Sequence, residues 1–286
     1  MIAGSYAPKS IATYMREVRY IIEYYPDQSP YEWKDTHITQ YLHYLKTTFN
    51  VSKAKCRCVA QAVAFFFRHV LKRAYDIPSK LYPRKEFKLP SVLTRQEVLQ
   101  LLGGCTSLKQ RCIVELFYSS GLRLEELTHL KMQDIDSPNK RIKVTKGKGD
   151  RQRYTILSAK LLEKLRKYYQ QEKVKPQVYL FEGRTVGKHM HTRSIQHSVR
   201  TAYEKAAMAD KTHKVHALRH SFATHMLDSG VDIHTIKELL GHSKIETSMV
   251  YLHLQTSKRN MLVSPLDTLD EPANDITHIP RYKKML

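Results

Sequence analysis

Five places in the chain hold polar residues that the packing of amphipathic helices does not explain. In chain order, these residues are Arg123, Lys148, His216, Arg219, His242 and Tyr251. His216 and Arg219 are three residues apart, so they share one face of a helix. An arginine offers paired donors to phosphate oxygens and stays charged at any working pH. Lys148 stands between two glycines, which let the backbone approach a bulky partner and bring an ammonium to a phosphate ester. Residues of these types could do chemistry, and the turn at Lys148 could do it at a phosphate ester.

Each of these residues also has an ordinary structural alternative. Arg123 follows a Ser-Ser-Gly break and can pair with Glu125 or Glu126 on its own helix. Lys148 can belong to a plain polar turn, and His242 can interact with the last carbonyls of the helix before it. The chain has 18 tyrosines, so a single tyrosine carries little information. Taken singly, these alternatives compete well with a chemical role.

A metal site and a disulfide framework are not expected. His216, His220 and His225 lie near one another in the sequence, but no HExxH pattern accompanies them. The four cysteines form no CxxC pair and are too few for a disulfide scaffold: Cys56, Cys58, Cys105 and Cys112. We therefore expect neither a metal nor any other cofactor.

The composition predicts a folded protein that attracts a polyanion. The 286 residues carry 48 basic and 27 acidic side chains, a formal net charge of +21, and 42% of them are hydrophobic. Both 1–93 and 94–260 share the basic excess, which argues against a neutral body with one basic arm. A surface made basic for solubility is the alternative, but so high a charge repels itself. We expect nucleic acid as the partner.

Nothing in the sequence predicts a membrane segment. The longest apolar run, Ala62 to Phe67, is far shorter than the ~20 residues that a membrane helix needs. Residues 1–10 lack the charged-then-apolar layout of a signal peptide. We expect a soluble protein of a reducing compartment.

The first part of the chain has the apolar periodicity of helices. We predict helices over 10–25 with Ser10 as cap, over 36–48 with Thr36 as cap, and over about 53–75, a stretch long enough for two helices. Pro83 and Pro90 then flank a charged run, which predicts an interdomain linker over 79–93. Its basic side chains suit a path along a phosphate backbone, and a plain solvated linker is the alternative.

A second domain begins at a capping box formed by Thr94 and Glu97. We predict helices over 109–119, 158–171, 191–208, 217–229 and 232–240, with Gly230 and Gly241 where C-terminal caps belong. Between them, residues 140–157 switch to period two, with Ile142 and Val144 before a basic turn and Tyr154 and Ile156 after it. This pattern predicts a β-hairpin that carries Lys148 at its tip. The fold class is therefore mainly α with a small antiparallel β-sheet in the C-terminal domain.

Taken together, in this order and spacing, the polar segments resemble the tyrosine recombinase (phage integrase) family. The matching segments are 120–127, 147–149, 216–225, 239–243 and Tyr251. The resemblance covers roughly residues 8–263 and is most specific between His216 and Tyr251. The chain is similar to chromosome-dimer resolvases and to integron integrases. Only about seventy residues separate Lys148 from His216, which leaves no room for the insertion that integron integrases carry there.

The resemblance implies a C-shaped, two-domain clamp around duplex DNA. Its parts would be a helical core-binding (SAM-like) domain over 1–78, a linker over 79–93, a catalytic domain over 94–263 and a tail over 264–286. It implies a homo-tetramer on two DNA sites, a cytoplasmic and nucleoid-associated location, and strand exchange without metal or ATP. The C-terminal apolar residues would dock within the chain or on a neighbour: Met261, Leu262, Val263 and Leu266.

The resemblance also implies a role for each polar residue. Tyr251 would be the nucleophile that forms a covalent 3′-phosphotyrosine, while Arg123 and Arg219 would clamp the nonbridging oxygens. His216 would be the general base or proton shuttle, and His242 would donate a hydrogen bond to the scissile phosphate. Lys148 would be the general acid for the leaving 5′-oxygen, with Lys146 as its rival.

Two other functions compete with site-specific recombination. A type IB topoisomerase uses a similar set of residues but relaxes supercoils as a monomer. A catalytically silent DNA-binding protein would need none of the six residues. The DNA site, and the choice among integration, inversion, dimer resolution and transposition, stay open at this point.

Overall fold

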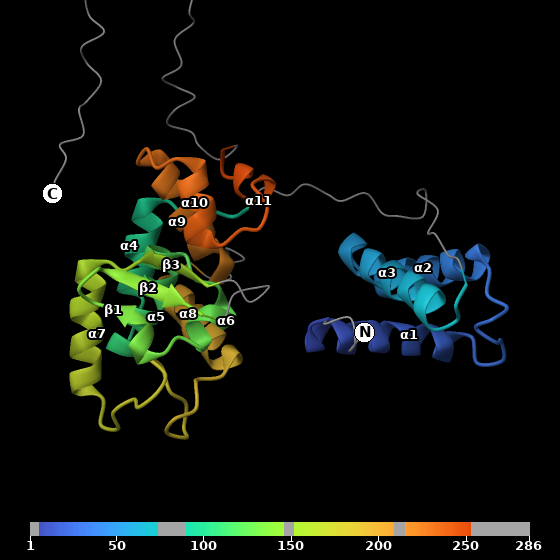
Figure 1. Cartoon of the computed structure of the whole chain (residues 1–286), viewed down its shortest axis with the longest axis horizontal. Helices are drawn as coiled ribbons and strands as arrows, with labels where there is room; N and C mark the ends of the chain where they lie inside the picture. The colour runs from blue at the N-terminus through green and yellow to red at the C-terminus, as the bar shows by residue number, and fades with distance from the viewer. Residues whose placement is uncertain (1–5, 74–89, 146–151, 209–214, 253–286) are drawn as a thin grey trace, which may run out of the picture. The chain divides into compact units, whose positions relative to one another are not determined.

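The computed structural model describes residues 6–73, 90–145, 152–208 and 215–252. The chain divides into two compact units, Met1–Lys88 and Leu89–Leu286, and each is described here by itself (Figure 1). Lys146, Lys148, the linker residues 79–89 and the apolar residues from Met261 to Leu266 lie outside the described residues. None of the helices in the described part of the chain is both long and apolar enough to cross a bilayer.

The N-terminal unit contains the helices α1 (Pro8–Tyr24), α2 (Asp35–Phe49) and α3 (Lys53–His69). They enclose a core built around Trp33, Ile38 and Phe67, each of which is almost completely buried. Among the described residues, α3 is one helix that ends at His69, so the prediction that it continues through residues 70–73 was wrong.

The predicted caps of the first two helices were also wrong. Ala7 is the N-cap of α1, and Pro8 occupies its first turn, where the fixed φ of proline suits a helix and its missing N–H costs nothing. Ser10 therefore lies inside the helix. In α2 the N-cap is Lys34, whose backbone N–H donates to Nδ1 of His37 at 2.9 Å. Thr36 therefore lies within the first turn of the helix and is not its N-cap.

The second unit is mainly helical. Its elements are α4 (Arg95–Gly103), α5 (Leu108–Ser120), α6 (Leu124–Thr128), η2 (Met132–Asp134), β1 (Ile135–Asp136), β2 (Arg141–Val144), β3 (Arg153–Ile156), α7 (Ala159–Gln171), α8 (Thr192–Lys205), α9 (Val215–Asp228), α10 (Ile233–Leu240) and α11 (Glu246–Met249). The capping box that opens α4 is confirmed: Thr94 Oγ1 accepts from the Glu97 N–H at 3.2 Å, and Glu97 Oε2 accepts from the Thr94 N–H at 2.9 Å. The five predicted helices correspond to α5, α7, α8, α9 and α10, although α8 ends three residues before the predicted boundary.

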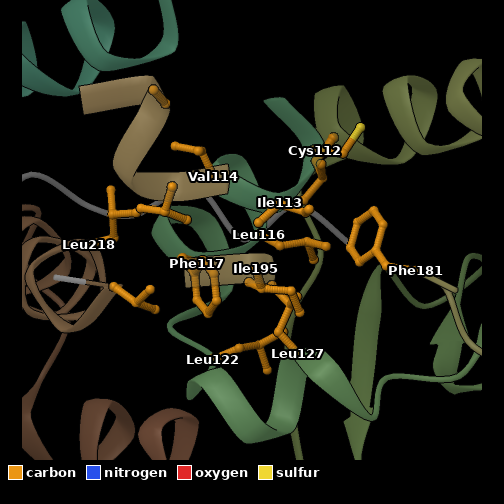
Figure 2. Packing of buried hydrophobic residues seen from close by; sticks show 14 of the residues in the cluster. Cys112, Ile113, Val114, Leu116, Phe117, Leu122, Leu127, Phe181, Ile195 and Leu218 are labelled. Carbon is orange, nitrogen blue, oxygen red and sulfur yellow. The ribbon is translucent and has the colours of Figure 1, made fainter. Parts of the chain in front are cut away.

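Helix α5 is the centre of this unit. It is buried on nearly every side, and it packs against α7, α8 and α9. Figure 2 shows its residues Ile113, Leu116 and Phe117 in one cluster with Ile195 of α8 and Leu218 of α9. Burying one such side chain stabilises a fold by about 1.5–3 kcal/mol. The rigid end of α5 therefore makes a firm base for the loop that follows it.

The small sheet has the order β1-β2-β3, and both strand pairs are antiparallel. The hairpin prediction is confirmed, and the fold class is as predicted. On β3, however, the buried residue is Thr155, whereas Tyr154 and Ile156 are exposed. The register explains this: Thr155 pairs with buried Ile142, so both face the core, and the Thr155 hydroxyl donates to the Ser120 carbonyl at 2.8 Å. The two-residue strand β1 is too short to show a period in the sequence.

Candidate active site

Arg123 owes its position to the sharp turn between α5 and α6. Gly121 ends α5 in the left-handed region, with φ of 60°. A Cβ at this position would lie 2.5 Å from the Phe222 ring and 2.8 Å from Leu240, so glycine is required for both conformation and space. Arg123 then becomes the N-cap of α6, and its guanidinium donates to the Gly241 carbonyl at 3.1 Å. The turn thus brings Arg123 to the end of α10.

Glu126 is a buried carboxylate shared by several arginines. It accepts from the backbone N–H of Arg123 at 2.7 Å and from its guanidinium at 2.8 Å. Arg153 of β3 donates to both of its oxygens, at 2.7 and 2.8 Å, and Arg219 lies 3.8 Å away. Burial by itself would raise the pKa of Glu126, but the hydrogen bonds and charges of Arg153 and then Arg123 lower it to about 2. The carboxylate therefore stays ionised and fixes these guanidinium groups.

Arg219 of α9 is almost completely buried and holds the site together. Its guanidinium donates to the carbonyl of Gly121, to that of Leu240 at 2.6 Å, and towards Nε2 of His242 at 3.2 Å. Burial, together with the nearby charge of Arg123, lowers the pKa of Arg219 to about 9, so it remains charged at neutral pH. One side chain thus joins the α5–α6 turn, the end of α10 and the histidine beyond it.

His242 lies on the turn that follows α10. Gly241 caps that helix with φ of 63°, and His242 Nδ1 lies 2.8 Å from Oγ of Ser248. Burial lowers the pKa of His242 to about 3, and the charges of Arg219 and Arg123 act in the same direction. The ring is therefore neutral. Because Nε2 accepts from Arg219, Nδ1 carries the proton and donates to Ser248.

Tyr251 is buried with its hydroxyl held by His220. Only 2% of the Tyr251 side chain is exposed, and its hydroxyl lies 3.0 Å from Nδ1 of His220. The ring also stacks on that of His242, with centroids 6.3 Å apart and planes 15° from parallel. Burial raises the pKa of Tyr251, while the charges of Arg219 and Arg123 oppose the rise.

These residues line one pocket of the second unit. Its walls are Pro90, Arg123, His216, Arg219, His220, His242, Thr247, Val250 and Tyr251. The structure therefore brings five of the predicted site residues together: Arg123, His216, Arg219, His242 and Tyr251. Lys148 and its rival Lys146 lie outside the described residues. Within the described ranges, no three His, Cys, Asp or Glu side chains gather as metal ligands do.

Sequence reasoning missed several residues that support the site. The sequence predicts Glu126 only as a surface partner of Arg123, and no pattern in it points to Arg153 or Ser248. His220 was considered only as a metal ligand, although its spacing of four residues from His216 places both on one helix face. That spacing is the signal that points to His220. The long-range partners of Glu126 leave no comparable pattern.

Comparison with known proteins agrees with this geometry. Residues 91–258 match the family described as "Phage integrase family", and residues 1–77 match "Phage integrase, N-terminal SAM-like domain". Tyrosine recombinase XerA of Thermococcus kodakarensis is 34% identical over 249 residues, which cover 86% of this chain and 84% of that protein. Tyrosine recombinase XerC of Lactobacillus delbrueckii subsp. bulgaricus is 29% identical over 268 residues, which cover 87% of this chain and 90% of that protein.

A solved structure shares the fold. It is the crystal structure of the XerH site-specific recombinase bound to palindromic difH substrate, a post-cleavage complex. Its TM-score is 0.72 at 22% identity, over 92% of this chain and 80% of that chain. Together, the matched family and the relatives of similar length establish that this chain belongs to the phage integrase family, the tyrosine recombinases, which are enzymes that cleave and rejoin DNA.

Proposed function

We propose that this recombinase attacks a DNA phosphodiester with the Tyr251 hydroxyl and forms a covalent 3′-phosphotyrosine. The observation that carries the proposal is that Arg123, Arg219, His242 and Tyr251, from separate segments of the chain, line one pocket. A phenol is a competent nucleophile when neighbouring groups take its proton and stabilise the charge of the transition state. The positions of these side chains supply that environment.

The two arginines are suited to bind the nonbridging oxygens of the phosphate. Carbonyl groups and Glu126 already hold both guanidinium planes, so little reorganisation is needed when a phosphate arrives. The Arg123 side chain is 26% exposed, which leaves part of it open to a ligand, whereas Arg219 is deeper. We assign Arg123 to direct phosphate contact and Arg219 to the inner wall of the same oxyanion site.

Three further roles complete the proposed reaction. His242 donates a hydrogen bond to the phosphate once a ring nitrogen is released from its present partners. His216 is exposed on the first turn of α9, and it shuttles protons at the mouth of the pocket. Lys148 is the proposed acid for the leaving 5′-oxygen, on the strength of the family resemblance. Because the phosphotyrosine conserves the energy of the broken bond, rejoining to another 5′-end needs no ATP.

The proposed partner is duplex DNA bound by four copies on two sites. The +21 charge suits a polyanion, and the related XerH structure contains its difH substrate. Residues 1–78 are the proposed core-binding domain, 79–93 the linker, 94–263 the catalytic domain and 264–286 the tail. Since the substrate is DNA, we place the protein in the cytoplasm with the nucleoid. The family match does not favour topoisomerase activity or silent binding.

The test is adduct formation with a supercoiled plasmid that carries the DNA flanking the gene. We expect the full chain to become covalently attached, detected as protein–DNA adducts on denaturing gels, and the captured ends give the site by sequencing. Tyr251→Phe should bind the plasmid but form no adduct. An adduct with this variant would show that another residue is the nucleophile, and relaxation without exchanged products would favour a topoisomerase.

A further inference from the structure

His220 provides a proton acceptor at the atom that would attack. Its Nδ1 lies 3.0 Å from the Tyr251 hydroxyl, and the two ring centroids are 5.7 Å apart. His216, the residue predicted as the base, lies one turn earlier on α9 and is exposed, with its ring centroid 6.5 Å from that of His220. The contact with His220 is a hydrogen bond made to the reacting oxygen itself.

The surroundings decide the direction of this hydrogen bond. His220 faces His216 and Arg219 from α9, His242 from the turn after α10, and Tyr251. Burial, and after it the charges of His216 and Arg219, lower the pKa of His220 to about 4, so the ring is neutral at pH 7. Burial raises the pKa of Tyr251, so the phenol keeps its proton. The phenol therefore donates and Nδ1 accepts, with the ring proton on Nε2.

We propose that His220 is a further catalytic residue, which takes the phenolic proton of Tyr251 as the hydroxyl attacks the phosphate. The inference rests on the proposed function, with Tyr251 as nucleophile. In this step the bond from Tyr251 Oη to phosphorus forms and the bond from phosphorus to the 5′-oxygen breaks. The phenolic proton moves to Nδ1, which leaves an imidazolium, and the 5′-oxygen takes a proton from the separate acid proposed above. Rejoining returns both protons.

The phosphate itself would make this base effective. In the site without DNA, Arg219 disfavours a charged imidazole at His220. A phosphate bound by Arg123 and Arg219 brings negative charge beside them, which raises the affinity of His220 for a proton. The tyrosine is therefore kept protonated until a DNA phosphate occupies the pocket.

The same helix offers a matched control. Nδ1 of His225 lies 2.9 Å from the hydroxyl of Tyr118, and these rings are also 5.7 Å apart. Both pairs join α9 to a tyrosine, which is buried at Tyr251 and partly buried at Tyr118, but the pair of His225 and Tyr118 is not part of the pocket wall. Replacing either histidine with asparagine leaves an amide oxygen near the position of Nδ1, which accepts a hydrogen bond but cannot take a proton.

The experiment compares His220→Asn, His220→Ala, His225→Asn, Tyr251→Phe and the unchanged chain with the same plasmid, across pH 6–10. We expect His220→Asn to slow adduct formation at pH 7 by about 10²–10⁴-fold. Its rate should keep rising with pH as the phenol ionises, whereas the unchanged chain levels off. Plasmid binding by His220→Asn, and both binding and adduct formation by His225→Asn, should stay within about threefold of the unchanged chain. Added imidazole should partly restore adduct formation by His220→Ala.

The outcomes separate this inference from the proposed function. If Tyr251→Phe forms no adduct while His220→Asn matches the unchanged chain in rate and pH profile, only the role of His220 is overturned. If His220→Asn loses adduct and plasmid binding equally with an unchanged pH profile, and imidazole does not restore adduct formation by His220→Ala, the role of His220 is structural and the inference fails. An adduct formed by Tyr251→Phe would instead overturn the proposed function.

Discussion

At the scale of single residues, Arg219 shows why this pocket needs a guanidinium and not merely a positive charge. Three acceptors from distant parts of the chain converge on its planar end: the Gly121 carbonyl, the Leu240 carbonyl and His242 Nε2. A lysine ammonium has the same charge, but its donors have no fixed planar arrangement and its side chain is shorter than that of arginine. It would leave buried carbonyls without donors, at a cost of about 1–3 kcal/mol each.

We therefore predict that Arg219→Lys loses most of its cleavage activity. The expected fall in the rate of adduct formation is about 10²–10³-fold, as for the loss of one preorganised donor to an oxyanion. Arg111→Lys is a suitable control, because Arg111 is partly exposed and pairs with Glu115 on its own helix. Adduct formation on the plasmid and thermal melting give the two readouts. Cleavage near the rate of the unchanged chain would argue against a bidentate clamp.

At the scale of elements, the pair of Glu126 and Arg153 joins the sheet to the catalytic helices. Arg153 on β3 binds both oxygens of Glu126 on α6 and donates from Nε to the Leu239 carbonyl at 2.8 Å. A Cβ on Gly241 would lie 2.8 Å from Cδ of Arg153, so the turn before His242 packs directly on this arginine. The hairpin that leads to Lys148 is thereby anchored to the helices that carry Arg123 and His242.

We predict that Glu126→Gln destabilises the second unit in a pH-dependent way. The substitution should lower the free energy of unfolding by about 3–5 kcal/mol at pH 7, because it removes the negative charge that balances the buried arginines. The pKa of Glu126 is lowered to about 2 in the fold, so its stabilisation is complete above the ordinary carboxyl pKa and is lost as the pH falls towards 2. Urea unfolding followed by circular dichroism at pH 7, 4 and 3 measures the free energy of unfolding of Glu126→Gln and of the unchanged chain. If the difference in free energy of unfolding between the unchanged chain and Glu126→Gln did not become smaller as the pH falls, this explanation would be wrong.

At the scale of the whole molecule, the charge of +21 serves two purposes. Basic side chains are in excess in both units, so the charge is not confined to the pocket. In the proposed complex, basic side chains outside the pocket neutralise backbone phosphates, which supplies affinity without regard to sequence. In the proposed reaction the arginines of the pocket act at one phosphate, where geometry matters more than the sum of charges.

We therefore predict a steep salt dependence of DNA binding that is independent of catalysis. With about 6–10 phosphate contacts, affinity for a plasmid-derived duplex should fall about 10³–10⁵-fold between 50 and 200 mM salt. Tyr251→Phe should show the same slope, since it removes no charge. Fluorescence anisotropy at several salt concentrations measures both proteins. A shallow slope would mean that few of the basic side chains meet phosphates.

Local patterns in the sequence were enough for the helices and the hairpin, because capping residues, glycines and apolar periods act over a few neighbouring positions. The box at Thr94, the end of α10 at Gly241 and the α9 segment with its histidines and arginine are of this kind. They also sufficed to indicate the family, whose signature lies in short motifs. The predicted caps of the first two helices were wrong. Helix α1 begins with Pro8 in its first turn, and in α2 the side chain of His37 bonds to the N-cap backbone.

The sequence by itself thus determined most of the longer helices, the hairpin, the fold class and the set of polar residues worth testing. Only the tertiary structure decided that Glu126 is shared by Arg123 and Arg153, that Thr155 faces the core, and that His220 holds Tyr251. These contacts join residues far apart in the chain, and they depend on the packing of α9 and β3 on α5 and of α10 on α9 and β3. Packing of that kind is a property of three-dimensional distances, which no local period of residues encodes.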